Sequence, residues 1–260
     1  MITLVVVNFK TSTDLFDFCK SYEENPPSVE SQLVIVNNEP EEADMKVANH
    51  FVERGTCQLH IAQENLYYSG ALNRAGMMVP NWDVIAYFNA DTQLTPGVVD
   101  SCYDLIMDND DIGVVGPAQV NKRGDVTHAG IFGTLAAPKH RGWKDRWRTE
   151  YEDVADAVTV SGSAYFVRRE CYEDQDTCSL YRELHPDVEG PFLPTNHYYE
   201  ETWFSYHAQA HGWRVVYNGQ ASMIHEWHKA TPVGGWAEQQ MPHSRKMFRE
   251  MCDHHDIDHD

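Results

Sequence analysis

Residues 84–94 read Val-Ile-Ala-Tyr-Phe-Asn-Ala-Asp-Thr-Gln-Leu, and this stretch decides the fold that we predict. The run from Val84 to Phe88 is short, apolar and rich in β-formers, which is typical of a buried strand. Asn89 and Asp91 follow directly at its carboxyl end, and ligands of open α/β sheets bind at that edge. Because a carboxylate there suits a hard cation, we predict that Asp91 binds a metal ion that holds a diphosphate.

An alternative role for Asp91 is to cap the helix that follows. Thr95 is a good N-cap residue, and Pro96 suits the first position of a helix. The helix that we predict over residues 96–107 therefore does not need Asp91, which stays available for a ligand.

The first 110 residues alternate between apolar strands and amphipathic helices. We predict strands over 2–7, 33–36, 58–62 and 84–88, with helices beginning near residue 12 and over 43–51, 69–79 and 96–107. This order favours a parallel sheet with helices on both faces, that is, an α/β fold. Neither a GxGxxG nor a GxxxxGK[ST] motif is present, so dinucleotide and P-loop folds are not indicated.

The second half of the chain has a different pattern of elements. We predict strands over 112–115, 126–132, 158–168, 213–217 and 222–224, with helices over 198–211 and 244–251. Gly162 interrupts one of these strands, and glycine inside a strand often marks a close approach of the backbone to a ligand. We predict one domain with a nucleotide-binding half (1–110), an acceptor and metal half (111–228) and a C-terminal extension (229–260).

The overall charge excludes several classes of partner. With 20 Lys and Arg against 40 Asp and Glu, the formal charge is −20. Such a field repels nucleic-acid backbones and anionic membrane surfaces. No apolar run is long enough to span a membrane, and the N-terminus lacks the features of a signal peptide. The six cysteines show no CxxC spacing, so we expect free thiols and a cytoplasmic protein. We make no prediction of the oligomeric state.

Two stretches near the ends of the second half have alternative interpretations. Residues 136–153 hold the one basic concentration of the chain, together with Trp143 and Trp147. They form either an ordinary solvated loop or a mobile lid that meets phosphate and sugar. The tail at 253–260 is rich in His and Asp; it binds metal loosely or, as we expect, is a frayed charged end.

Several motifs at the ends of the predicted elements belong together. They are Val7-Asn8-Phe9, Glu64-Asn65-Leu-Tyr-Tyr-Ser-Gly70-Ala-Leu-Asn73-Arg74, Asn89-Ala-Asp91-Thr92, Ser161-Gly162-Ser163-Ala164 through Arg168-Arg169, Glu200-Glu201-Thr-Trp-Phe, His211-Gly212-Trp213-Arg214-Val215 and His225. In their order and spacing they resemble the GT-A glycosyltransferases, in particular the inverting family 2 group and its rhamnosyltransferase-like branch. The resemblance extends from residue 2 to about residue 228.

This resemblance implies a mixed sheet flanked by helices and transfer of a sugar from a nucleotide-diphosphate sugar (UDP, dTDP or GDP) to an acceptor hydroxyl. It implies Mn²⁺ or Mg²⁺ on Asp91 and His225, because Asn89-Ala-Asp91-Thr92 matches the metal motif and His225 stands where the family places a histidine. The carboxylate oxygen of Asp and the imidazole nitrogen of His suit such an ion. The acceptor is a glycan, a lipid-linked sugar or a protein side chain.

The residues predicted to hold the donor follow from the same motifs. We assign Asn8, Asn37 and Asn65 to the nucleoside, since amides both donate and accept hydrogen bonds. Each of them is also a common turn residue. Arg74 either reaches phosphate or lies on the surface. The remaining donor-binding candidates are Asn73, Asn89 and Gly162.

Glu201 is our candidate for the general base, and Glu200 is its rival. Two adjacent residues of a helix point about 100° apart, so only one of these acids faces the cleft. The alternative is that both simply favour the helix dipole in the first turn.

Several positions depart from the family pattern. Asn37 stands where the family has an Asp that contacts the nucleoside, and Tyr67 replaces a glycine. Trp203 replaces the second acid of the catalytic helix, and Glu201 replaces the usual Asp. These departures keep open a non-catalytic carbohydrate-binding or scaffold protein on a degenerate GT-A fold. A sugar nucleotidyltransferase is a further alternative, although it normally has a Gly-rich basic loop after the first strand, which Asn8 to Ser12 lacks.

Overall fold

The computed structural model describes residues 1–134, 138–175, 179–181, 190–226 and 235–259. Its elements, in chain order, are β1 (Ile2–Asn8), α1 (Ser12–Glu24), β2 (Ser31–Asn38), α2 (Glu42–Glu53), β3 (Gln58–Ala62), α3 (Tyr67–Met78), β4 (Val84–Asn89), β5 (Thr92–Gln93), α4 (Val98–Met107), β6 (Ile112–Val120), β7 (Val126–His128), β8 (Ile131–Gly133), β9 (Pro138–His140), η1 (Thr149–Tyr151), β10 (Val154–Asp156), β11 (Ala164–Arg168), α5 (Arg169–Glu173), η2 (Ser179–Tyr181), α6 (Glu200–Ala210), β12 (Arg214–His225) and α7 (Trp236–His254).

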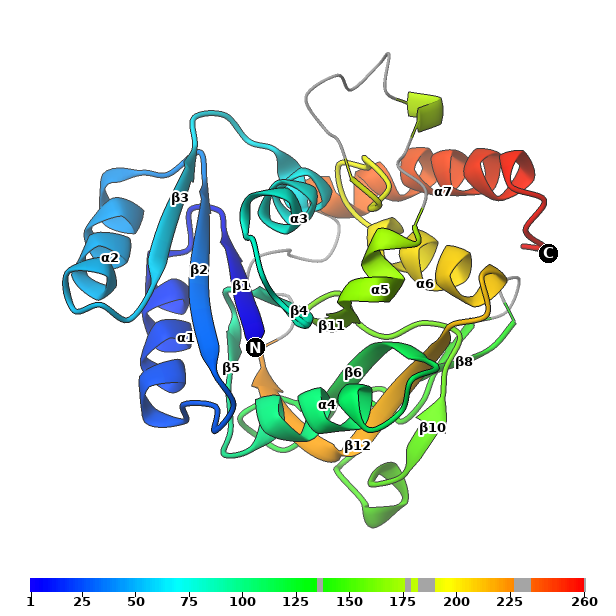
Figure 1. The fold of residues 1–260 in the computed structure, drawn as a ribbon, viewed down its shortest axis with the longest axis horizontal. Helices are drawn as coiled ribbons and strands as arrows, with labels where there is room; N and C mark the ends of the chain where they lie inside the picture. Colours follow the sequence, from blue (N-terminus) through cyan, green and yellow to red (C-terminus); the bar gives the residue numbers. More distant parts are fainter. Residues whose placement is uncertain (135–137, 176–178, 182–189, 227–234, 260) are drawn as a thin grey trace.

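One mixed sheet organises the described part of the chain (Figure 1). Its strand order is β10-β12-β6-β11-β4-β1-β2-β3, with β5 paired to β12 and β7 paired to β6. β1 runs parallel to both β2 and β4, and β2 runs parallel to β3. The parallel sheet predicted for the first 110 residues is therefore confirmed. Every residue of β1 is buried, as expected for a central strand covered on both faces.

The second half adds antiparallel strands to this sheet. β11 runs antiparallel to both β4 and β6, whereas β12 runs parallel to β6. The two strands predicted over 213–217 and 222–224 are in fact one strand, β12. Its pairing with β6 is irregular between Asn218 and Ser222, where the backbone at Gly219 lies close against the Tyr151 carbonyl. The Asn-Gly pair therefore marks a bulge and not a chain reversal.

Helices cover both faces of the sheet. On one face, α1, α2 and α4 pack over Leu4 and Val6 of β1. On the other face, α3, α5 and α6 pack over Val5 and Val7. Successive residues of a strand point to opposite faces, so the continuous apolar run of β1 supplies both layers of core.

A third apolar cluster joins α7 to α6. Trp203 is fully buried and packs with a set of residues on α7, which comprises Met247, Phe248, Met251 and Cys252. Figure 1 shows α7, coloured orange to red, beside α6 at the upper right of the view. The terminal helix predicted over 244–251 is thus part of a longer helix that begins at Trp236 and contains Pro242.

Two other predicted boundaries were wrong. α4 begins at Val98, after Gly97 in a left-handed conformation with φ 74°. Thr95 does not cap it, because its hydroxyl donates to the Ser222 carbonyl of β12. The strand predicted over 158–168 begins at Ala164, since residues 161–163 turn at the sheet edge. Predictions on residues 136–137, 227–228, 260 and the start of the C-terminal extension lie outside the described residues.

Among the described helices, none combines the length and the apolar character that crossing a membrane requires.

We predict that Trp203 contributes far more to stability than an exposed tryptophan of the same region. Trp203→Ala should lower the free energy of unfolding by about 3–5 kcal/mol, because it leaves a cavity between α6 and α7. Trp236 is 50% exposed, and Trp236→Ala should cost less than about 1 kcal/mol. Urea unfolding of the two variants measures both values, and equal losses would contradict this role of Trp203.

Candidate active site

A cavity of about 470 Å³ opens at the carboxyl ends of β1, β2 and β4, next to the first turn of α6. It is enclosed by residues of both halves of the chain, and α7 contributes its first turn. The predicted site residues that line it are Asn65, Asn89, Asp91, Gly162, Glu200, Glu201 and His225.

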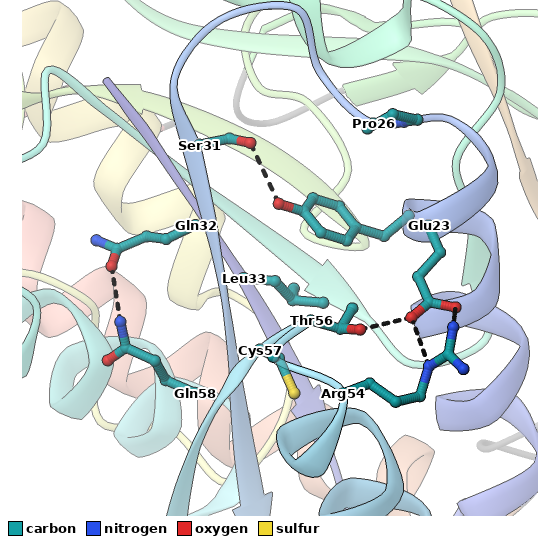
Figure 2. A pocket seen from close by; sticks show the side chains of 11 residues that line it. Glu23, Pro26, Ser31, Gln32, Leu33, Arg54, Thr56, Cys57 and Gln58 are labelled. Carbon is teal, nitrogen blue, oxygen red and sulfur yellow. Dashed lines mark hydrogen bonds and ion pairs between the residues drawn. The ribbon is translucent and has the colours of Figure 1, made fainter.

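A second hollow, of about 580 Å³, lies at the amino-terminal ends of β2 and β3, on the opposite edge of the sheet (Figure 2). The charged side chains of Arg54 and Glu23 form an ion pair there, and the Thr56 hydroxyl also donates to the Glu23 carboxylate. Since the predicted chemistry converges on the first cavity, that cavity is the candidate active site.

Asp91 and His225 meet in this cavity although they are far apart in sequence. Asp91 Oδ1 lies 3.7 Å from His225 Nε2, and the two side chains are 7% and 6% exposed. Thr92 of β5 pairs with His225 of β12, and the Glu226 amide donates to the Asp91 carbonyl at 3.3 Å. The short ladder between β5 and β12 therefore sets the position of both side chains.

The hydrogen bonds of His225 orient its ring toward Asp91. His225 Nδ1 lies 2.8 Å from Gln119 Oε1, and the Ser163 hydroxyl donates to the same oxygen at 2.7 Å. An amide oxygen accepts and does not donate, so this network assigns the imidazole proton to Nδ1. Nε2 then presents its lone pair on the side of Asp91, as a metal ligand requires.

The geometry of this pair fits a divalent cation. The separation of 3.7 Å is too long for a direct hydrogen bond, but an ion about 2.1 Å from each atom spans it. One carboxylate oxygen and one imidazole nitrogen suit Mn²⁺ and also serve Mg²⁺. The described residues contain no cluster of three or more His, Cys, Asp or Glu that could hold a metal. Other ligands would therefore come from water or from a bound diphosphate.

Glu201 packs directly against the backbone of Gly162. The nearby backbone amides of Gly162 and of the first turn of α6 favour the ionised form of its carboxylate. A Cβ atom on Gly162 would lie 3.2 Å from Glu201 Cδ, so this position favours glycine. The close contact at Gly162 is therefore with the Glu201 side chain, and the predicted approach to a ligand stays a prediction. Glu201 Oε2 is buried and has no hydrogen-bond partner within the described structure. Such an oxygen is ready to accept a ligand proton.

Glu200 lies beside it in a different environment. The Thr195 hydroxyl is 3.0 Å from Glu200 Oε2 and 2.8 Å from the Tyr198 carbonyl. One hydroxyl proton cannot be donated to both oxygens, so a protonated Glu200 that donates to Thr195 satisfies all three groups. Burial, and then the adjacent charge of Glu201, raise the pKa of Glu200 to about 8. Burial also raises the pKa of Glu201, and the nearby backbone amides oppose this rise. We therefore assign the proton of this pair to Glu200.

The turn before α6 holds these two acids under strain. Tyr198 and Tyr199 have φ angles of 67° and 73°, a left-handed conformation that is costly for aromatic residues. Arg245 of α7 donates to the Tyr199 hydroxyl at 2.8 Å, and Ser244 donates to the His197 carbonyl at 2.6 Å. α7 thus supports the turn from outside the cavity.

Four predicted donor-binding residues do not line the cavity. Asn8 and Asn37 are fully buried, and the Asn8 amide donates to Asn37 Oδ1 at 2.8 Å and to Asp44 at 3.0 Å. Asn73 is buried as well and exchanges hydrogen bonds with the backbone of Phe192. Arg74 is exposed on α3. The contacts of the three asparagines hold strand ends and a loop together.

Two residues of the site, Asn38 and Gln119, were not among the predicted site residues. Asn38, next to Asn37, lines the cavity and donates to Asn65 Oδ1 at 2.9 Å. The Asn37-Asn38 pair was visible in the sequence, but only one of two adjacent strand residues can face a given side. No sequence signal distinguished Gln119, which lies fully buried on β6.

The described part of the basic stretch, residues 138–153, lies away from the cavity. Three of its arginines pair with nearby carboxylates, as Arg141–Asp153, Arg146–Asp125 and Arg148–Asp145. None of the described residues between 138 and 153 lines the cavity. In this structure the contacts agree with the alternative of an ordinary surface segment.

Comparison with known proteins identifies the fold. No protein-family model matches the sequence, and no curated protein matches it either. A mannosyltransferase from Pyrobaculum calidifontis, solved with GDP-Man and Mn²⁺, matches 90% of this chain with a TM-score of 0.59 and 13% identity. GalNAc-T7, solved with UDP, GalNAc and Mn²⁺, matches 86% with a TM-score of 0.64 and 12% identity. S. aureus TarS (residues 1–349) matches 86% with a TM-score of 0.59 and 12% identity.

These similarities show that the chain has the GT-A fold of the nucleotide-diphospho-sugar transferases, as predicted. The chain spans only 58%, 43% and 60% of the lengths of the three matched chains.

Protonation of Glu200 predicts a specific pH dependence of stability. Between the ordinary Glu pKa of about 4.5 and the folded value of about 8, the folded state holds a proton that the unfolded state releases. The contribution of Glu200 to stability is therefore fully present below the lower value. It is lost as the pH rises toward 8, by at most about 1.4 kcal/mol per pH unit.

Urea unfolding across this pH range tests the prediction. Glu200→Gln should flatten the decline, whereas Glu64→Gln, a change at an exposed position, should leave it as in the wild type. An unchanged decline in Glu200→Gln would show that Glu200 is ionised in the folded protein.

Proposed function

We propose that this protein is a metal-dependent inverting glycosyltransferase that moves a sugar from a nucleotide-diphosphate sugar to an acceptor hydroxyl. The observation that carries the proposal is the convergence of Asp91, His225 and Glu201 on one cavity of a GT-A fold. The ligands printed for the matched structures, GDP-Man, UDP and Mn²⁺, belong to the same chemistry. Membership of family 2, and of its rhamnosyltransferase-like branch, is part of this proposal.

The leaving diphosphate has to be neutralised for the transfer to occur. Asp91 and His225 would hold Mn²⁺ or Mg²⁺, which acts, when bound, as a Lewis acid toward the phosphate oxygens. Gln119 positions His225 for this role through the proton on Nδ1. The rest of the chain is strongly acidic, so a nucleotide would depend on local cation binding.

Glu201 would accept the proton of the acceptor hydroxyl. The acceptor oxygen forms a bond to the anomeric carbon while the bond from that carbon to the phosphate oxygen breaks, and the nucleoside diphosphate leaves. Attack from the face opposite the leaving group inverts the anomeric configuration. Glu200 holds its proton and leaves Glu201 to act as the base.

The donor nucleoside would lie against the part of the cavity wall that three asparagines form. These are Asn38, Asn65 and, at the end of β4, Asn89. Amides of this kind recognise the edge of a nucleobase, in UDP, dTDP or GDP, by donating and accepting hydrogen bonds. The five described cysteines are free, in keeping with the cytoplasmic location that we propose.

The competing functions find less support in the structure. A sugar nucleotidyltransferase would need a Gly-rich basic loop after β1, and the residues there are Phe9, Lys10 and Thr11. A scaffold on a degenerate fold would not need a buried Asp–His pair beside a buried and a half-buried acid, Glu200 and Glu201.

We predict that Glu201→Gln lowers kcat by roughly 10²–10⁴-fold, because the variant keeps the shape of the side chain and loses the base. Glu200→Gln keeps a neutral side chain beside Thr195 and should lower kcat by less than about tenfold. Turnover of a panel of nucleotide sugars with Mn²⁺ measures both effects. A larger loss in Glu200→Gln than in Glu201→Gln would exchange the two roles.

We also predict a graded loss of Mn²⁺ binding. In the presence of UDP or GDP, Asp91→Asn should abolish measurable binding of Mn²⁺. Gln119→Leu should weaken it by about 10–100-fold, and Gln119→Glu, which keeps the acceptor, should not. Calorimetric titration of Mn²⁺ gives the affinities. Wild-type affinity in Asp91→Asn would remove Asp91 from the metal site.

A further inference from the structure

Two stacked aromatic side chains form part of the cavity wall. The rings of Tyr67 and Trp236 have centroids 5.5 Å apart and an interplanar angle of 11°. Both residues line the cavity that contains Glu201. Trp236 is 50% exposed, although tryptophan is usually well buried. The pair therefore presents a broad, accessible aromatic surface at the site.

The position of Tyr67 is held by specific hydrogen bonds. Tyr67 has a φ angle of 56°, which a glycine would adopt at no cost and which is unfavourable for tyrosine. Its amide donates to Asn65 Oδ1 at 2.8 Å, and its carbonyl accepts from Asn38 Nδ2 at 3.1 Å. Strain of this kind persists where the surroundings fix the conformation, and it concentrates at ligand sites.

Trp236, the second ring of the stacked pair, is linked through α7 to the segment that precedes Glu201. Trp236 begins α7, and Gln240 of this helix accepts a hydrogen bond from Asn196 at 3.1 Å. Residues Asn196, His197 and Tyr198 line the cavity and lead directly into Glu200 and Glu201. α7 thus joins the aromatic surface to the turn that carries the base.

The chemistry of these surroundings matches a sugar ring. A pyranose has an apolar C–H face that packs on an aromatic ring and a rim of hydroxyls that hydrogen-bonds to polar groups. Tyr67 and Trp236 offer the aromatic surface, and Asn196 and His197 offer polar groups beside it. A lipid chain would bury the polar groups of Asn196 and His197 against methylene groups. An anionic polymer would be repelled by a chain of formal charge −20.

We propose that Tyr67 and Trp236 form the acceptor subsite and that the acceptor is a neutral sugar residue stacked on Trp236. The term acceptor rests on the proposed function, because the sugar must offer a hydroxyl to Glu201. Binding of the saccharide itself does not require the donor or the metal.

Saccharide binding to the metal-free protein tests this proposal. The probes are the methyl glycosides of glucose, galactose, mannose and rhamnose, followed by saturation-transfer NMR up to about 10 mM. At least one probe should bind the wild type. Trp236→Ala should weaken it by at least about fivefold, and Trp236→Phe, which keeps a ring, should weaken it less. Trp143→Ala, a change outside the cavity, should bind as the wild type does.

The outcomes separate this proposal from the proposed function. Saccharide binding that depends on Trp236, in a protein that turns over no nucleotide sugar, would support the subsite and count against the transferase. Donor turnover that needs Glu201, together with saccharide binding unchanged in Trp236→Ala, would overturn the subsite alone. Absence of binding for every probe would overturn it as well. So would a Trp236→Ala variant that loses affinity for UDP or GDP and not for the saccharide, because the ring would then hold the nucleobase.

Discussion

The pairing of the two-residue strand β5 with the end of β12 is the constraint on which the rest of the site depends. Thr92 pairs with His225 and Gln93 with Ile224, so the turn after β4 is fixed to a strand that is remote in sequence. β12 is held in turn by a long parallel ladder with β6. Side chains alternate along a strand, so a slip of one residue in this ladder would turn His225 away from Asp91. The metal chemistry that we propose therefore rests on backbone register as much as on the identity of two side chains.

Burial is the second condition that the cavity imposes. Carboxylates taken out of water hold their protons more tightly, and two adjacent acids cannot both stay ionised at neutral pH without a large cost. The two acids differ in their surroundings. Nearby backbone amides favour the ionised form of Glu201, whereas Glu200 meets a hydroxyl that is already close to another acceptor. The same asymmetry that makes one acid a base leaves the other neutral, and it destabilises the fold as the pH rises. Stability is commonly sacrificed in this way at functional sites.

Continuous apolar runs are local signals, and they predicted the parallel half of the sheet. The grouping of Asp91, Glu201 and His225 was implied by the resemblance to the GT-A glycosyltransferases. The sequence did not predict which amides face the cavity. Asn37 and Asn38 are adjacent on β2, so they point to opposite sides, and the side that faces the ligand depends on packing against Asn8 and Asp44. Gln119 was missed for a related reason, since its role exists only once β6 and β12 are paired. The strands over 213–217 and 222–224 were predicted separately, because only their common pairing with β6 joins them into one strand with a bulge.

Trp203 shows why a departure from a family pattern need not remove function. It stands where the resemblance leads one to expect a second acid, two residues after Glu201. Two residues along a helix correspond to a rotation of about 200°, so Trp203 points away from the side that Glu201 presents to the cavity. It packs instead against Met247, Phe248 and Met251 of α7. An acid at this buried position would have no comparable partner, whereas the tryptophan fastens α7 to α6. α7 supports the strained turn before Glu200 and carries Trp236 into the cavity wall. The absence of an acid at position 203 thus removes no group from the cavity. Trp203 instead stabilises the cavity wall indirectly, through its packing against α7.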